Sequence, residues 1–247
     1  MYNVVKENSS SSCHKTMGAL KAMQYADKYS LTREQNIRFA KKNFTRLVHT
    51  NSRFEGVSTT LPQTQTIMDG MGVSGVSVKD MNTIVNLKRG WEMVVQPQKE
   101  ALTLNYMKKI NAVVAAQDSL APGELRTGGG LVQIGSDEDF VPDPVNEKKE
   151  QKFLTELLAN SAISITDKAM TLMYHSMRNQ IFWDGNKRTA TLVANKLMID
   201  NGVGLINIPL NHWEKWNELI ADYYRSNDMG AIKKWTYEVG VQGVQLP

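Results

Sequence analysis

The stretch 180–189, Gln-Ile-Phe-Trp-Asp-Gly-Asn-Lys-Arg-Thr, constrains the fold of this chain more than any other, because it separates two amphipathic helical patterns. Apolar residues recur at three- and four-residue steps on both sides of it, which is the spacing of one face of a helix. The first set runs into the stretch and consists of Ile165, Ala169, Leu172, Met173, Met177 and Ile181, and the second set, after it, consists of Ala190, Val193, Ala194, Leu197 and Met198. Asn201-Gly202 ends the second pattern. The sequence therefore predicts two long helices joined by a short polar loop.

The polar loop carries the residue types that bind a polyphosphate. A turn that opens a helix presents free backbone N–H groups, which form a site for an anion. Lys187 and Arg188 add positive charge there, and the carboxylate of Asp184 suits a hard cation such as Mg²⁺ beside the same phosphates. The alternative is that Asp184-Gly185-Asn186 is only a turn and that the two cations are only solvated. Composition alone favours that alternative.

The order of residues in the loop resembles a known signature. Phe182-x-Asp184-Gly185-Asn186-x-Arg188 is similar to the motif of the Fic/Doc (Fido) family, His-x-Phe-x-Asp/Glu-Gly-Asn-Gly-Arg-x-x-Arg. Asn186-Lys187-Arg188 is closer to the Doc branch of that family. Two positions depart from the motif: Gln180 stands where the family has its catalytic His, and Thr191 stands where it has its second Arg.

The resemblance implies a role for each position of the loop. Asp184 would coordinate Mg²⁺, and Gln180 would occupy the catalytic position. Phe182 would be a core anchor that fixes the loop. The residues that would contact the nucleotide are Gly185, Asn186, Lys187, Arg188 and, at the position of the second arginine, Thr191.

A second motif lies near the N-terminus. Thr32 can cap a helix whose apolar stripe is Ile37, Ala40, Phe44, Leu47 and Val48, and we expect that helix over about 33–56. Glu55-Gly56 at its end is, by itself, an ordinary helix C-terminus. Autoinhibited Fic proteins carry Ser/Thr-x-x-x-Glu-Gly/Asn at such a place, and Asn51-Ser52-Arg53-Phe54-Glu55-Gly56 is similar, with Asn51 in the first position. The resemblance implies an inhibitory glutamate, and because the second arginine is absent, Glu55 would pair with Arg188 or Lys187.

The segment Gly123–Pro144 is the one that looks extended, and a hairpin is predicted there. The triple glycine 128–130 is not a P-loop, because the Gly-Lys-Ser/Thr ending is missing and no helix follows directly. The segment resembles the Fic flap, which implies that Leu131, Val132, Gln133 and Ile134 would clamp a target protein by strand pairing. A hairpin with a purely structural role is the alternative.

The resemblance implies a mainly helical, single domain over 31–247, of the Fic type with a small hairpin flap. A serine run predicts a flexible lead-in over 1–30. Residues 59–75 are expected to be a loop with one short helical turn, and 91–95 are ambiguous between helix and strand. A single cysteine in 247 residues fits a reducing cytoplasm. The net charge of +4 is mild and the basic residues are scattered, so we expect no nucleic-acid surface, and no apolar run is long enough for a membrane span. Oligomers are possible.

The function implied by the resemblance is transfer of AMP from ATP to a protein hydroxyl, with ATP and Mg²⁺ bound at the loop. We expect this activity to be weakened or altered, because the amide of Gln180 does not accept a proton near neutral pH. The alternatives are a non-catalytic nucleotide- or peptide-binding module on the same fold, and a Doc-like protein phosphotransferase. A helix-turn-helix that binds DNA through Lys187-Arg188 would leave Asp184, the hairpin and Glu55 without a role.

Overall fold

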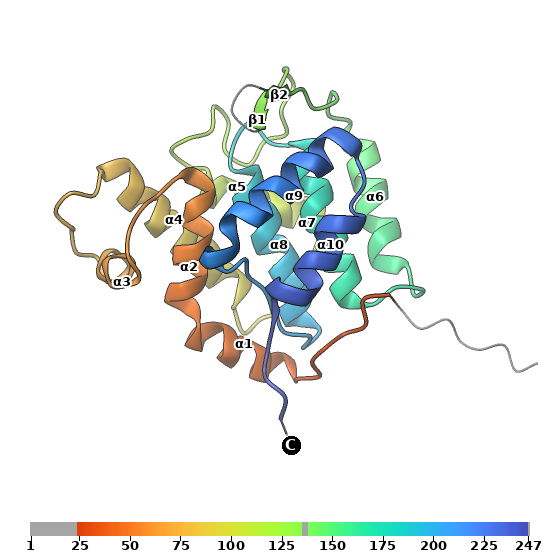
Figure 1. Cartoon of the computed structure of the whole chain (residues 1–247), viewed down its shortest axis with the longest axis horizontal. Helices are drawn as coiled ribbons and strands as arrows, with labels where there is room; N and C mark the ends of the chain where they lie inside the picture. Colours follow the sequence, from red (N-terminus) through yellow and green to blue (C-terminus); the bar gives the residue numbers. More distant parts are fainter. Residues whose placement is uncertain (1–23, 135–137, 247) are drawn as a thin grey trace, which may run out of the picture.

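The computed structural model describes residues 24–134 and 138–246. Its central element is α8 (Asn186–Asp200), in which every residue except Lys187 and Asp200 is buried. The other long helices surround α8, as Figure 1 shows. They are α1 (Arg33–Lys42), α2 (Phe44–Ser52), α4 (Val78–Val94), α5 (Leu104–Val114), α6 (Glu147–Ala159), α7 (Ile165–Asn179) and α9 (Trp213–Ser226). The mainly helical fold predicted from the sequence is confirmed, and the predicted pair of helices around the polar loop is α7 and α8.

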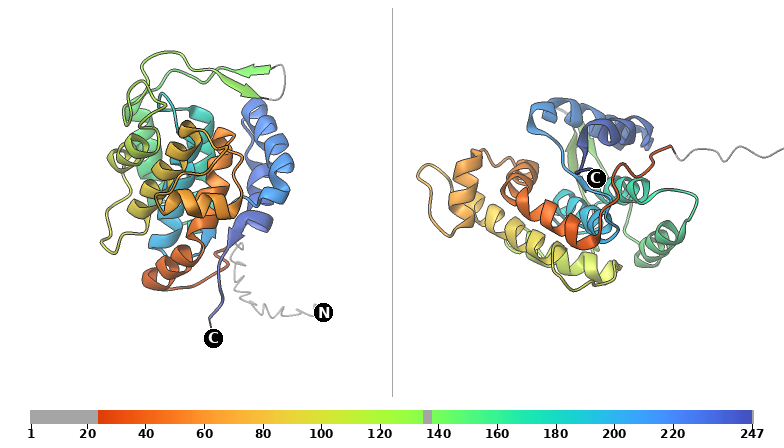
Figure 2. Two further views of the ribbon diagram at one scale, coloured as in Figure 1. Left: turned by 90° about the vertical axis from the view of Figure 1, so that its left-hand side faces the viewer. Right: turned by 90° about the horizontal axis from the view of Figure 1, so that it is seen from below.

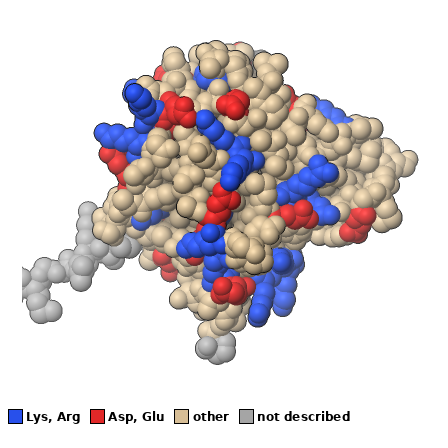
Figure 3. All heavy atoms as spheres, turned by 180° about the vertical axis from the view of Figure 1, so that it is seen from behind, with Lys and Arg blue, Asp and Glu red and all other residues tan. Residues whose placement is uncertain are grey.

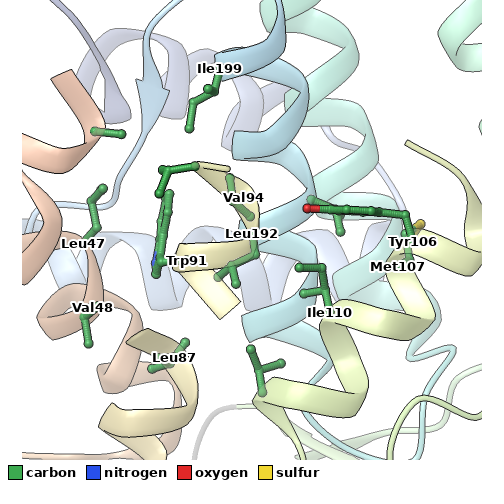
Figure 4. Packing of buried hydrophobic residues seen from close by; sticks show 14 of the residues in the cluster. Leu47, Val48, Leu87, Trp91, Val94, Tyr106, Met107, Ile110, Leu192 and Ile199 are labelled. Atoms are coloured by element: carbon green, nitrogen blue, oxygen red, sulfur yellow. The ribbon is translucent and has the colours of Figure 1, made fainter. Parts of the chain in front are cut away.

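One side of α8 packs against the N-terminal helices. Trp91 of α4 is fully buried there, close to Leu47 of α2 and to Leu192 of α8 (Figure 4). Helix α4 also approaches α5 and α8 closely at Gly90. A Cβ atom at that position would lie 2.6 Å from both Leu192 and Val114, nearer than carbon atoms can pack. The predicted ambiguity at 91–95 is resolved as helix.

The other side of α8 packs against α7 and the C-terminal helices. Ala190 and Ala194 of α8 share a cluster with Met170 and Met173 of α7, and such small side chains let two helices approach closely. Helix α9, helix α10 (Gly230–Trp235) and the π-turn η3 (Thr236–Gly240) complete this cluster. Trp216, Tyr223 and Tyr224 of α9 are therefore buried core residues.

The N-terminal helical segment is not continuous. Thr32 caps α1 in a capping box with Gln35, as the sequence predicts. At Asn43 the backbone leaves helical geometry (φ −104°, ψ 9°), and the side-chain amide of Asn43 donates to the carbonyl of Phe39, a competition that weakens helices. The single helix predicted over 33–56 is therefore α1, α2 and the short 3₁₀ turn η1 (Arg53–Glu55), which Gly56 ends at φ 73°.

Residues 24–30 belong to the folded body. Asp27 accepts hydrogen bonds from the backbone and the hydroxyl of Thr166, both at 2.7 Å, and Tyr25 is 5% exposed. The predicted lead-in over 1–30 is therefore too long at its C-terminal end. Its remainder, with Cys13 and the serine run, lies outside the described residues.

Two short antiparallel strand pairs lie on the helical body. The predicted hairpin is β1 (Val132–Ile134) and β2 (Glu138–Phe140), with Val132 opposite Phe140, and it overhangs the helices beside α9 (Figure 2). The second pair, β3 (Leu205–Ile206) and β4 (Val241–Gln242), was not expected from the sequence. The 3₁₀ turn η2 (Leu210–His212) precedes α9. Helix α3 (Leu61–Met68) replaces the single helical turn predicted within 59–75, and it is capped by Thr60.

Charged side chains of both signs lie side by side on the face shown in Figure 3. Several exposed ion pairs of this kind occur, including Lys88–Glu92, Lys109–Glu100 and Lys152–Glu156. Exposed pairs contribute little to stability. No helix in the described part of the chain is long and apolar enough to cross a bilayer.

Candidate active site

The loop between α7 and α8 is fixed by one of its own side chains. Asn186 accepts from the backbone N–H of Phe182 and donates to the carbonyl of Phe182, both at 2.9 Å. Phe182 is 2% exposed and forms an isolated bridge with Leu125, so it anchors the loop in the core. The buried side chain of Asn186 therefore holds the two ends of the loop together through the backbone of Phe182.

The N-terminus of α8 has no side-chain cap. Gly185 is the capping residue, with φ 69°, and a Cβ atom there would lie 2.8 Å from the Cβ of Ala115. Glycine is required on both counts. Asn111 of α5 supports the loop by donating to the carbonyl of Asp184 and to the hydroxyl of Thr189. The first N–H groups of α8 are thus held rigidly and lack the usual Ser, Thr or Asp cap, which is the geometry of an anion site.

Arg188 is the best-enclosed charge of the site, with a side chain that is 0% exposed. Its Nη1 donates to the carbonyl of Val114 and to Oδ2 of Asp118 at 2.9 Å, and its Nη2 donates to Oδ1 of Asp184 at 3.3 Å. Its Nε lies 2.7 Å from Oε1 of Glu55, but the N–H bond does not point along that line, so Nε has no hydrogen-bond acceptor among the described residues. Glu55 and Arg188 form an ion pair, which is the contact expected once Thr191 replaces the second arginine.

Burial changes the pKa of Glu55 and that of Lys187. Desolvation raises the pKa of Glu55, and the negative charges of Asp184 and Asp118 raise it further, whereas Arg188 and Lys187 lower it. Desolvation also lowers the pKa of Lys187, against the opposing effect of Glu55. Three carboxylates and two cations therefore share one partly dehydrated site. A cavity of about 530 Å³ opens beside it, lined by Glu55, Lys79, Asn82, Gln117, Asp118 and Asp184.

Thr191 is not presented to the loop. It is 3% exposed, and its hydroxyl donates to the carbonyl of Lys187 one turn earlier in α8. Its predicted contact with a nucleotide has no geometric support, because that hydroxyl already serves the backbone of its own helix. Asp184 is different: its side chain is 44% exposed and lines the cavity.

Gln180 caps α7 in the left-handed conformation, with φ 48°. Its amide nitrogen donates to the carbonyl of Met177 at 2.6 Å. The hydroxyl of Tyr224, from α9, donates to the same carbonyl at 2.8 Å. The side chain in the expected catalytic position is thus engaged with α7 and α9.

The hairpin is attached to the same loop by one arginine. Arg126 is 4% exposed and donates from its guanidinium to the carbonyls of Gly128 and Asp143, at the two ends of the flap, and to that of Gln180. Its backbone N–H donates to the carbonyl of Ile181 at 2.9 Å. Flap and loop are therefore one connected unit.

The far part of the flap rests on α9. The ring of Phe140 stacks on Tyr224 at 5.2 Å, and Glu138 pairs with Arg225 at 2.7 Å. Among the four predicted target-binding residues, Leu131 is 65% exposed and Gln133 is exposed, whereas Val132 is partly buried and Ile134 is 5% exposed. Alternation of this kind places one face of the strand toward solvent and the other toward the helices.

Three residues of this site were missed from the sequence: Asn111, Asp118 and Tyr224. No spacing or motif marks them, since each acts from another element across the fold. Arg126 had a signal, because it lies within the segment Gly123–Pro144 that resembles the Fic flap. His175, on α7, contacts Glu150 at 2.8 Å and stacks on Phe153.

Comparison with known proteins agrees with this architecture. Residues 101–198 match the model of the Fic/DOC family. A Fic domain containing signaling protein from Bacteroides thetaiotaomicron superposes with a TM-score of 0.69 at 21% identity, over 82% of this chain and 80% of that one. These matches support the Fic family for this chain and show that its fold is the Fic fold.

Two further solved structures are similar. A Fic family protein from Desulfovibrio desulfuricans gives a TM-score of 0.68 at 16% identity, over 81% of this chain. Fic-1 from C. elegans gives 0.67 at 16% identity, over 80% of this chain. The chain spans 63% and 60% of those two proteins. No curated protein matches the sequence.

Proposed function

We propose that this chain is a Fic-type protein that binds ATP with Mg²⁺ at the N-terminus of α8 and transfers AMP to a hydroxyl of a protein held by the flap, in a form restrained by Glu55. The observation that carries the proposal is the Nε of Arg188: it is buried, charged and without an aligned acceptor, next to a helix start that has no side-chain cap. An oxyanion of a phosphate would satisfy it.

The residues present fit a nucleotide polyphosphate. The first N–H groups of α8, Lys187 and Arg188 would bind phosphate oxygens. Asp184 would hold Mg²⁺ together with those oxygens. No group of three or more His, Cys, Asp or Glu side chains in the described ranges could hold a metal alone, which suits Mg²⁺ because that ion commonly takes one or two carboxylates plus phosphate and water. When bound, Mg²⁺ would neutralise charge on the phosphates.

In the proposed step the hydroxyl oxygen of the target bonds to the α-phosphorus, the bond to the bridging oxygen breaks, and pyrophosphate leaves. Arg188 and the N-terminus of α8 stabilise the charge that moves onto the leaving oxygens. The flap would orient the target by strand pairing through the backbone N–H and C=O groups at its edge. The hydroxyl proton must leave to water, because the amide of Gln180 is not a base. Positioned bases contribute about 10²–10⁴-fold, so we expect a slow enzyme.

A non-catalytic binding module is the second candidate, and the hydrogen bond of Gln180 to Met177 favours it. A Doc-like phosphotransferase, suggested by Asn186-Lys187-Arg188, is the third. Incubation of the chain with α- and γ-labelled ATP in parallel separates the three. Protein labelled only from α-labelled ATP supports AMP transfer, and label only from γ-labelled ATP supports phosphate transfer. Binding of ATP with no label on protein supports the binding module.

A further inference from the structure

Asp118 lies on the turn that follows α5, next to Arg188. The turn is tight, since the backbone N–H of Asp118 and that of Ser119 both donate to the carbonyl of Ala115. The carboxylate is 16% exposed and lies 2.9 Å from Nη1 of Arg188. It belongs to neither the loop signature nor the Glu55 motif, and it stands on the helix that supports the loop through Asn111.

Arg188 has five N–H bonds, two on Nη1, two on Nη2 and one on Nε. The carbonyl of Val114 and the carboxylate of Asp118 accept the two from Nη1. The remaining edge, formed by Nε and Nη2, lies toward Glu55 and Asp184. A guanidinium binds a phosphate best through such a pair of parallel N–H bonds. Asp118 therefore acts on the side of the guanidinium away from the anion.

We propose that Asp118 is a positioning residue for anion binding: by holding Nη1 it fixes the guanidinium of Arg188, so that Nε and Nη2 stay on the side of the group where Glu55 lies and where a phosphate would bind. This inference rests on the proposed nucleotide site. It assigns opposite effects to two carboxylates that contact the same arginine, because Glu55 competes with the anion while Asp118 prepares its binding surface.

The opposite effects of Glu55 and Asp118 on anion binding distinguish the proposal from an effect of charge alone. Removing either negative charge would favour an anion if charge alone mattered. The test uses Glu55→Gln as the background, with inorganic pyrophosphate as the probe and calorimetry as the readout. Three changes are added singly: Asp118→Asn, which keeps an acceptor oxygen without the charge; Asp118→Ala, which removes the acceptor; and Asp118→Glu, which keeps the charge but displaces it.

Asp118→Ala and Asp118→Glu should weaken pyrophosphate binding about tenfold or more, the size expected from losing a hydrogen bond to a charged group, whereas Asp118→Asn should change it by less than about threefold. Glu156→Ala, which removes an exposed carboxylate of α6, is the matched control and should change nothing. Circular dichroism verifies that each variant is folded, and Asp118→Glu keeps the test decisive if Asp118→Ala does not fold.

Equal or tighter binding by Asp118→Ala and Asp118→Glu relative to the background would overturn the positioning role while leaving the nucleotide site intact. A background that binds neither pyrophosphate nor ATP with Mg²⁺ at millimolar concentration would overturn both the site and the role of Asp118. The two failures are therefore distinguishable.

Discussion

Gln180 and Tyr224 donate to one carbonyl oxygen, that of Met177, at 2.6 and 2.8 Å. Tyr224 also stacks on Phe140 of the flap. The side chain that aligns with the catalytic His of the Fic/Doc motif is thereby linked, through one backbone carbonyl and one aromatic ring, to strand β2 of the flap. We therefore expect a change at residue 180 to have two separable consequences, one for proton transfer and one for the support of the flap.

Gln180→His is expected to raise transfer from ATP to protein, including self-modification, by at least about tenfold. Imidazole accepts a proton near neutral pH, and tenfold is the low side of what a positioned base adds. The measurement is incorporation of α- and γ-labelled ATP. Gln180→Leu, which has no proton acceptor, is the control and should not gain activity. A wild type that labels protein as fast as Gln180→His would show that no base is needed at 180.

Glu55→Gln is expected to tighten ATP binding, because it removes the negative charge that competes for Arg188 and Lys187. The gain should be largest at low salt, where charge interactions are least screened. Glu55→Gly, which removes the whole side chain, should tighten ATP binding at least as much. Calorimetric titration with ATP at two salt concentrations measures both affinities. The double variant Glu55→Gly with Gln180→His should label more protein from labelled ATP than either single change. Unchanged or weaker affinity in both variants would mean that Glu55 only ends a helix.

The stability of the wild type relative to Glu55→Gln should fall as the pH rises from about 4 to 7. The pKa of Glu55 is raised above its ordinary value of 4.5, mainly by burial. The folded chain therefore binds this proton more tightly than the unfolded chain, and the resulting stabilisation is complete below 4.5 and lost as the pH passes the raised pKa. Urea unfolding of both proteins across this range measures the difference. A difference that does not change with pH would contradict the raised pKa.

ATP with Mg²⁺ is expected to raise the melting temperature of the wild type, because a ligand that binds only the folded state stabilises it by mass action. Asp184→Ala should lose the part of the shift that depends on Mg²⁺ and keep the part seen with ATP and a chelator. Thermal scans with and without the chelator separate these parts. A wild type that shows no shift at millimolar ATP would count against a nucleotide site.

Asn51→Ser would complete the inhibitory motif of the family, yet we expect it to destabilise the fold by about 1–3 kcal/mol. Asn51 is 1% exposed, and its Oδ1 accepts from the indole N–H of the fully buried Trp91 at 3.0 Å. A serine is too short to replace that acceptor, so a buried donor would be left unpaired. Urea unfolding gives the free energy. The same loss from Asn51→Ser in a Trp91→Phe background would show that the indole bond is not the cause.

The sequence predicted the helices of the site well because their apolar spacing is local information. The resemblance to autoinhibited Fic proteins, which have an arginine where this chain has Thr191, implied that Glu55 would pair with Arg188 or Lys187, and Glu55 does pair with Arg188. The sequence could not predict Asp118 or Asn111, which approach from α5 only after the helices pack. Backbone carbonyls as acceptors, such as those that hold Arg126, leave no mark in a sequence at all.

The other differences have similar causes. The nucleotide contact of Thr191 was predicted from its position in the motif and stays a prediction, although its hydroxyl donates to the carbonyl of Lys187. The pair β3 and β4 joins segments far apart in the chain, and two-residue strands have too little periodicity to be seen. The interruption at Asn43 depends on a side chain that bonds its own helix.

Arg126 joins the two ends of the flap, because its guanidinium donates to the carbonyls of both Gly128 and Asp143. The positions of the flap that do not contact the helical body can therefore change in length or sequence at little cost, since loop closure depends only weakly on length once the ends are joined. Ile134, Glu138 and Phe140 are different, because they pack against or pair with the helical body. We expect variation within the flap at its exposed positions, while its base stays fixed.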